Sequence, residues 1–361
     1  MPTPVLLILI LLIGTYGVLS GSASLGFLLA RREASPPDPP DWPSVSVVVP
    51  TAAPPTSNAI QQIQDCDYPT DRLEILVPTC GPADRSSCGG DEGTPVRPVS
   101  GFGETTGTPF PSAPPESVTD AAEGDIVLSM PTEGMTSSGW IRSMVRRCTP
   151  DTPIVVGPTI IEHRDLFLPR LQGLSHLGRL AFTVGLSHVG LPSLVETSNG
   201  AARVDALPAH DVNDPAQTQL HGAFRPTFNP EVAALVARTP VDSFDGFFRH
   251  LTHGLRRTGQ SPSWLVWGQG VGLWLVHTVL LACAVVAVAI PAWQQPTLLA
   301  LVAKMGADVI LTLPAATHYG QRGLFRSLVP TELLLVLALP IAGFWSLTTP
   351  SPHTGQVTES P

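Results

Sequence analysis

An uncharged apolar segment near the N-terminus, Val5 to Ala30, constrains this chain most strongly. As a helix rising about 1.5 Å per residue it would reach about 39 Å, which exceeds the roughly 30 Å hydrocarbon core of a bilayer. The alternative is a cleaved signal peptide, which has a basic start and a shorter apolar region. This chain begins MPTPV, and Arg31 and Arg32 follow as a stop signal. We therefore predict a retained transmembrane anchor at residues 1–30 and a Pro-rich linker at 31–43.

Three further apolar segments predict transmembrane helices within residues 263–347. They run Val271 to Trp293, roughly Pro296 to Ala316, and Leu328 to Leu347. Lys304 and Asp308 fall inside the second segment, where isolated charges are costly, but their four-residue spacing puts them on one helical face where they can pair. The second segment therefore either crosses the bilayer or lies flat in its interface.

Arginines beside the apolar segments predict the orientation. Arg31 with Arg32, Arg256 with Arg257, and Arg322 with Arg326 fall on one side of the membrane if four segments cross it. The positive-inside rule makes that side cytoplasmic. We therefore expect an integral protein of the plasma (inner) membrane whose large domain is cytoplasmic and whose termini are both outside. Residues 348–361 are expected to be a disordered tail.

The net charge indicates which binding partners to expect, and the cysteines indicate the redox compartment. The net charge is −9 and Lys304 is the only lysine, so binding to nucleic acid is not expected. The lipid bilayer is the expected partner. The cysteines are odd in number and follow no metal-ligand spacing, which favours free thiols in a reducing compartment. They are Cys66, Cys80, Cys88, Cys148 and Cys283.

Residues 44–262 carry the pattern of an α/β domain. Short β-branched or apolar runs alternate with a helical pattern, which is typical of β-α-β units in a doubly wound, parallel-rich sheet. The predicted strands are Val45–Val49, Leu73–Val77, Ile126–Leu128 and Ile154–Val156, with a helix over Asn58–Cys66. The segment Gly81–Pro115, rich in Gly, Pro, Ser and Thr, is predicted to be a loosely packed loop.

Two more helices are predicted in this domain. Ser137 or Ser138 can cap a helix that carries Trp140. Leu166–Leu191 has leucines at helical spacing, which predicts an amphipathic helix whose apolar face packs on the domain or lies on the membrane. Tryptophans at the start of the next apolar segment, from Trp264 onward, favour docking on the membrane, because tryptophan prefers the headgroup region.

Five stretches, in order, resemble the membrane-bound glycosyltransferases of family 2. They are PSVSVVVP (Pro43–Pro50), DYPTDRLEILV (Asp67–Val77), EGDIVLS (Glu123–Ser129), SGWIRSMV (Ser138–Val145) and SNGA (Ser198–Ala201). The resemblance covers roughly Pro43 to Leu347. It implies a GT-A-like (nucleotide-diphospho-sugar transferase) α/β domain with about four transmembrane helices. It also implies a nucleotide sugar and a Mg or Mn ion as cofactors of any activity.

The nucleotide- and metal-binding motifs of that family are largely replaced here. The paired aspartates that hold the nucleotide fall on Thr79 and Cys80, and Asp84 alone matches a family acid. The Asp-x-Asp motif falls on PTE, so that Glu133 is the one candidate metal ligand. The alternative role of Asp84 is a simple turn former, and the alternative role of Glu133 is a solvated loop acid.

The catalytic base and the diphosphate contact are also in question. The acidic triplet that follows SNGA in the family leaves Asp211 and Asp214 as candidates for the base. The Gln-x-x-Arg-Trp motif falls on FFRHLTHG, with His250, His253 and Gly254 at its three positions. A neutral histidine is a poor replacement for an arginine that meets a diphosphate. The two histidines are more typical of an interfacial helix than of a metal site.

These substitutions predict a pseudoenzyme. It would act as a partner or regulator in envelope polysaccharide or glycolipid synthesis, beside another glycosyltransferase or polysaccharide-synthesis protein. Two alternatives stay open. One is an active inverting transferase that moves a sugar to a lipid or glycan acceptor with a rearranged site built on Glu133 and either Asp211 or Asp214. The other is a membrane scaffold unrelated to sugars.

Overall fold

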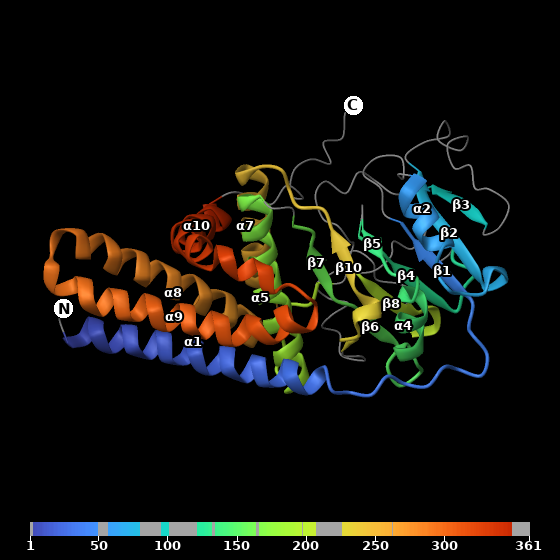
Figure 1. The fold of residues 1–361 in the computed structure, drawn as a ribbon, viewed down its shortest axis with the longest axis horizontal. Coiled ribbons are helices and arrows are strands. Elements are labelled where there is room, and N and C mark those ends of the chain that lie inside the picture. The colour runs from blue at the N-terminus through green and yellow to red at the C-terminus, as the bar shows by residue number, and fades with distance from the viewer. Residues whose placement is uncertain are drawn as a thin grey trace, which may run out of the picture.

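The computed structural model describes residues 3–49, 57–79, 95–100, 121–131, 134–163, 166–196, 198–206, 226–261 and 263–348. Figure 1 shows long helices at one end of the molecule and the sheets at the other. The helices are α1 (Thr3–Ala30), α2 (Ser57–Gln64), α4 (Trp140–Arg147), α5 (Phe167–His188), α7 (Phe244–Gly259), α8 (Trp264–Ala289), α9 (Gln294–His318) and α10 (Leu328–Thr348). Short 3-10 turns are η1 (Thr70–Arg72), η3 (Val204–Ala206), η4 (Val232–Ala234), η5 (Pro291–Trp293) and η6 (Arg322–Ser327).

The domain is built on a mixed, mostly parallel sheet in the order β3-β2-β1-β4-β8-β6-β9. Its strands are β1 (Val45–Val48), β2 (Leu73–Thr79), β3 (Val96–Ser100), β4 (Ile126–Ser129), β6 (Ile154–Val156), β8 (Gly200–Arg203) and β9 (Thr227–Phe228). Strand β8 alone is antiparallel to its neighbours β4 and β6. A smaller sheet has the order β5-β10-β7, from β5 (Met135–Thr136), β10 (Val236–Arg238) and β7 (Thr159–Ile161). The predicted α/β class is confirmed.

The centre of the large sheet follows from its apolar runs. Val47 pairs with Ile75 on one side and with Leu128 on the other, and all three are buried. Strands covered on both faces read as continuous apolar runs, which is why these strands could be predicted. Strand β3 is a correction, because it lies inside the segment predicted to be a loop. Its sequence, VRPVS, contains an arginine and a proline and shows no strand periodicity.

Helix α4 is held by its tryptophan rather than by a serine cap. Its N-cap is Gly139, with no side-chain capping bond, so the predicted cap at Ser137 or Ser138 is wrong. The Ser137 hydroxyl instead donates to the carbonyl oxygen of Ala233 at 2.9 Å. The buried Trp140 Nε1 donates to Asn199 Oδ1 at 3.0 Å, which fixes α4 against the SNGA segment.

The long helices form a bundle with a crossing layer. Helices α1, α8 and α9 lie along the long axis in Figure 1, whereas α10 is seen end-on and crosses them. Four helical segments are long and apolar enough to span a membrane: Thr3–Ala30, Trp264–Ala289, Pro291–His318 and Arg322–Thr348. Within α9, Lys304 Nζ lies 2.9 Å from Asp308 Oδ2, so the predicted pairing is confirmed. Glu332 of α10 joins the same ion-pair cluster.

Helix α5 joins the bundle to the domain. The predicted helix is confirmed, but its leucine stripe does not face lipid. Leu174 and Leu177 are buried in one cluster with Phe27 of α1 and with Leu311 and Ala315 of α9. The apolar face therefore packs against the chain's own long helices, and the expectation that it lies on the membrane is wrong.

Candidate functional site

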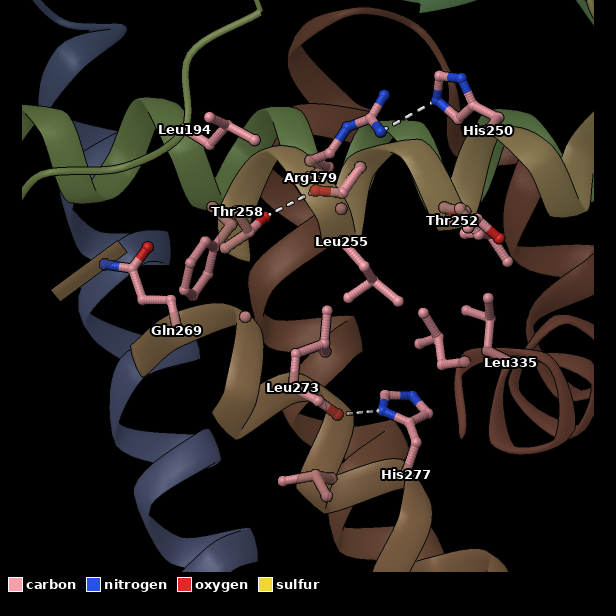
Figure 2. Close-up of a pocket in the computed structure, with 18 of the residues that line it drawn as sticks. Arg179, Leu194, His250, Thr252, Leu255, Thr258, Gln269, Leu273, His277 and Leu335 are labelled. Atoms are coloured by element: carbon pink, nitrogen blue, oxygen red, sulfur yellow. Dashed lines mark hydrogen bonds between the residues drawn. The ribbon is translucent and has the colours of Figure 1, made fainter. Parts of the chain in front are cut away.

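A cavity of about 1490 Å³ lies where α5 and α7 meet the helix bundle. Figure 2 shows part of its wall, with α7 crossing above α8 and the side chains of both helices directed into the space between them. Its charged side chains gather at two levels, one beside α5 and α7 and one between α9 and α10. Between them the wall is largely apolar, with leucines that include Leu255, Leu273 and Leu335.

The upper level is organised around Glu196, in the segment before β8. Its carboxylate accepts a hydrogen bond from Arg179 of α5 at 3.1 Å and another from Arg238 of β10. Burial alone would raise the pKa of Glu196, but the positive charges of Arg179 and its neighbours hold that pKa well below its usual range. Glu196 is therefore ionised at neutral pH, and its charge is committed to two arginines.

Two histidines accept hydrogen bonds from the same arginine. Arg179 Nη1 lies 3.0 Å from His250 Nε2, and Arg179 Nη2 lies 2.8 Å from His176 Nδ1. A guanidinium only donates, so both ring nitrogens accept and both rings are neutral. Burial lowers the pKa of His176 to about 4, and burial together with Arg179 lowers that of His250 to about 3. Figure 2 shows the Arg179–His250 bond bridging α5 and α7.

The upper level carries an excess of positive charge. Five arginines and two carboxylates line it, with Arg249 paired to Asp245 and Arg179 and Arg238 sharing Glu196. Arg257 also lines the cavity, and burial lowers the pKa of its guanidinium. A site with more guanidinium groups than carboxylates favours an anion, and phosphate is the group that arginine binds with the best geometry.

The described ends of the parallel strands carry no carboxylate. Strands β1, β2 and β4 run parallel, so their carboxyl ends share one edge of the sheet, where ligands bind in open α/β folds. Thr79 ends β2, while the described residues after β1 and β4 include Val49 and the buried Pro131. Within the described ranges no three His, Cys, Asp or Glu side chains could hold a metal ion. The donors present there do not fit Mg or Mn, which prefer several oxygen ligands.

Several predicted site residues lie outside the described residues. They are Cys80, Asp84, Glu133, Asp211 and Asp214. His250 and His253 do lie on one helix, α7, and both line the cavity. Sequence reasoning missed Arg179, Glu196 and Arg238. One weak indication was present in the sequence, because Arg179 lies in the predicted helix over Leu166–Leu191 but outside the positions of its leucine stripe.

Comparison with known proteins supports the fold. No family model matches the sequence, and no curated protein matches it. Among solved structures, the mannosyltransferase PcManGT from Pyrobaculum calidifontis, in complex with GDP-Man and Mn2+, is similar with a TM-score of 0.53. The two are 17% identical over 94% of this chain and 99% of that one. S. aureus TarS 1-349 with UDP-GlcNAc gives a TM-score of 0.34 at 10% identity, over 83% and 90% of the two chains. The chain therefore has a glycosyltransferase-like α/β fold, with four helices of membrane-spanning length.

Proposed function

We propose that this protein is an integral-membrane, glycosyltransferase-like pseudoenzyme that acts as a partner or regulator in envelope polysaccharide or glycolipid synthesis. The observation that carries the proposal is the edge of the sheet where β1, β2 and β4 end. Transfer from a nucleotide sugar releases a diphosphate, whose charge is normally neutralised by a metal ion held by carboxylates. Thr79 and Pro131 stand where the resemblance expects aspartates, and neither can serve as such a ligand.

The cavity favours the binding of a lipid over the binding of a soluble ligand. Its upper level is rich in arginine, and its wall below is formed by leucines of α7, α8 and α10. A molecule that matches both parts has an anionic headgroup and an apolar tail. Small-molecule sites usually enclose about 300–1,000 Å³, so a cavity of about 1490 Å³ suits a larger, lipid-sized ligand.

The positions of the arginines support an inner-membrane protein whose large domain is on the cytoplasmic side. Arg31 and Arg32 follow α1, Arg256 and Arg257 precede α8, and η6 carries Arg322 and Arg326 between α9 and α10. Helix α1 begins at the opposite end of the bundle, far from the sheets (Figure 1). Basic residues gather on the cytoplasmic side of membrane proteins, so this distribution favours a cytoplasmic domain.

An active inverting transferase is the second candidate. PcManGT was solved with GDP-Man and Mn2+, and the likeness covers 99% of its chain. Glu133, Asp211 and Asp214 lie outside the described residues. If these three acids complete the edge of the sheet, they would supply the metal ligand and the base, and a lipid in the cavity would be the acceptor.

Thermal unfolding of the full-length protein in detergent separates the two candidates. The midpoint is measured with GDP-mannose, UDP-glucose or UDP-N-acetylglucosamine, each with and without Mn2+. A competent site at a ligand concentration of 100 times its Kd gains about 2.7 kcal/mol. The proposal predicts no stabilisation that needs both metal and nucleotide sugar. Such a stabilisation, lost in Glu133→Ala, would contradict the pseudoenzyme and support the transferase.

A further inference from the structure

The lower level of the cavity is a polar cluster in the middle of the helix bundle. His277 lies thirteen residues into α8, about 20 Å along the helix, and Lys304 lies about 21 Å from the domain end of α9. His277 is 1% exposed and Lys304 is 2% exposed. Polar side chains at this depth are costly in lipid and mark functional sites by default. His277 and Lys304 line the same cavity as the arginines of the upper level.

Most polar groups of this cluster form ion pairs or hydrogen bonds with one another. Lys304 Nζ contacts the carboxylates of both Asp308 and Glu332, and the Tyr16 hydroxyl of α1 donates to Asp308 Oδ1. One ammonium thus faces two carboxylates. When all three groups are ionised the cluster carries one negative charge, so the lower level favours hydrogen-bond donors, in contrast to the arginine-rich upper level.

Apart from Asp308 Oδ2, which is ion-paired with Lys304, two buried polar atoms at this level have no hydrogen-bond partner among the described residues. They are His277 Nε2 and Thr331 Oγ1, and each residue is 1% exposed. His277 Nδ1 lies 2.8 Å from the carbonyl oxygen of Leu273, which only accepts, so the proton of the neutral ring is on Nδ1. Nε2 is therefore an acceptor. Figure 2 shows the His277 ring at the cavity wall, lower in the view than Leu255 and Leu335.

We infer that the lower level is a second subsite of the cavity, which binds the hydroxyl group of a membrane lipid. A hydroxyl can donate to His277 Nε2 and can accept from the Thr331 hydroxyl. A cationic group would also suit the local charge, but an ammonium at this depth is far more costly to bury than a neutral hydroxyl. The surrounding leucines of α7, α8 and α10 accommodate the apolar chains. The inference rests on the proposed lipid-binding role and adds the chemical class of the ligand.

The test uses the full-length protein and two pairs of lipids. In each pair the members differ only in whether the hydroxyl is free: 1,2-dioleoylglycerol with its 3-acetyl ester, and geranylgeraniol with geranylgeranyl acetate. Ligand-induced shifts of the unfolding midpoint give the relative affinities. We expect at least one alcohol to bind roughly tenfold tighter than its acetate, because the ester cannot donate to His277 Nε2. Which pair shows the preference tells a glycerolipid from an isoprenoid alcohol.

The variants separate a binding role from a structural one. In His277→Leu and in Thr331→Val the preference for the free hydroxyl should fall toward unity. The unfolding midpoint without lipid should change little in His277→Leu. The substitution removes an acceptor that has no partner and the Nδ1–H bond to the Leu273 carbonyl oxygen, which keeps its backbone bond within α8. Thr278→Val, next to His277 but outside the cavity lining, is the matched control and should keep the preference. Equal binding of alcohol and acetate in both pairs, or a preference that persists in both cavity variants, would overturn the inference. The nucleotide-sugar measurement is independent of this result, so the proposed function and this inference can fail separately.

Discussion

Gly26 of α1 and Gly185 of α5 lie in direct backbone contact. A Cβ atom added to Gly26 would overlap the Gly185 carbonyl oxygen, and one added to Gly185 would overlap the Ala23 carbonyl oxygen. Only glycine permits two helices to approach so closely. The contact fixes the N-terminal helix against the helix that supplies Arg179, so it sets the position of the bundle relative to the upper level of the cavity.

The first prediction concerns this contact. Gly185→Ala should destabilise the protein by about 1–3 kcal/mol or more, because a backbone atom cannot yield as a flexible side chain can. Gly17→Ala is the matched control, since it places the same methyl group on α1 where nothing lies within 4 Å. The control should leave the unfolding midpoint unchanged or raise it. Equal midpoints for Gly185→Ala and the control would show that the two helices are not packed as described.

The second prediction concerns pH. Because burial holds the pKa of His176 at about 4 and that of His250 at about 3, the unfolded chain takes up protons between roughly pH 6.5 and 4 while the folded chain does not. The free energy of unfolding should therefore fall as the pH falls from 7 to 5, by at most about 1.4 kcal/mol per histidine per pH unit. Glu196, whose folded pKa is depressed, loses its contribution only below about pH 4.5.

His250→Gln tests that assignment, because glutamine still offers Arg179 an oxygen acceptor but does not titrate. The variant should lose less stability between pH 7 and 5 than the unmodified protein does. His163→Gln, outside the cluster around Arg179, should follow the unmodified protein. A His250→Gln profile as steep as that of the unmodified protein would contradict the assignment of His250 as a partly buried, neutral histidine.

The third prediction concerns the buried ion pairs. Lys304→Met leaves Asp308 and Glu332 without their cation and should destabilise the protein by about 3–5 kcal/mol. The triple variant Lys304→Met, Asp308→Asn, Glu332→Met should be near neutral or more stable, because replacing a whole buried charge cluster removes its desolvation cost. The unfolding midpoints in detergent decide, and a triple variant less stable than Lys304→Met alone would contradict this account.

The fourth prediction concerns orientation in the membrane. The described cysteines are buried and free. In a variant that lacks all native cysteines, a single thiol at Thr3 should react with an impermeant reagent added outside intact cells, and a single thiol at Asp151 should not. Permeabilised cells provide the control, since both thiols should then react. Labelling of Asp151→Cys but not of Thr3→Cys in intact cells would reverse the orientation.

The sequence predicted the parts of the fold that depend on continuous apolar runs. Strands β1, β2, β4 and β6 bury most of their described residues, and the long helices are apolar along their length, so both appear in the sequence as apolar runs. Strand β3 could not be predicted in this way, because Arg97 makes ion pairs with Glu74 and Glu123 across the edge of the sheet rather than contributing to an apolar run.

The site was less accessible to prediction. Arg179, Glu196 and Arg238 come from a helix, a connecting segment and a strand of the smaller sheet, and only the tertiary fold brings them together. Likewise, the pairing of Lys304 with Asp308 follows from helical spacing, whereas the contribution of Glu332 depends on α10 crossing the bundle. Local patterns therefore predicted a charge contact within one helix but not the charge contacts between elements.

The central claim is that the protein does not transfer sugar, and turnover by the purified full-length protein tests it most directly. Loss of one charged partner in a transition-state clamp costs about 10² to 10³ in rate, and the resemblance implies several such losses here. The measurement is release of nucleoside diphosphate from GDP-mannose, UDP-glucose and UDP-N-acetylglucosamine, with Mn2+ and with diacylglycerol or isoprenoid alcohol as acceptor. We predict the same background rate for the unmodified protein and for a variant with alanine at Glu133, Asp211 and Asp214. Robust release by the unmodified protein that the triple substitution abolishes would contradict the account and establish an active transferase.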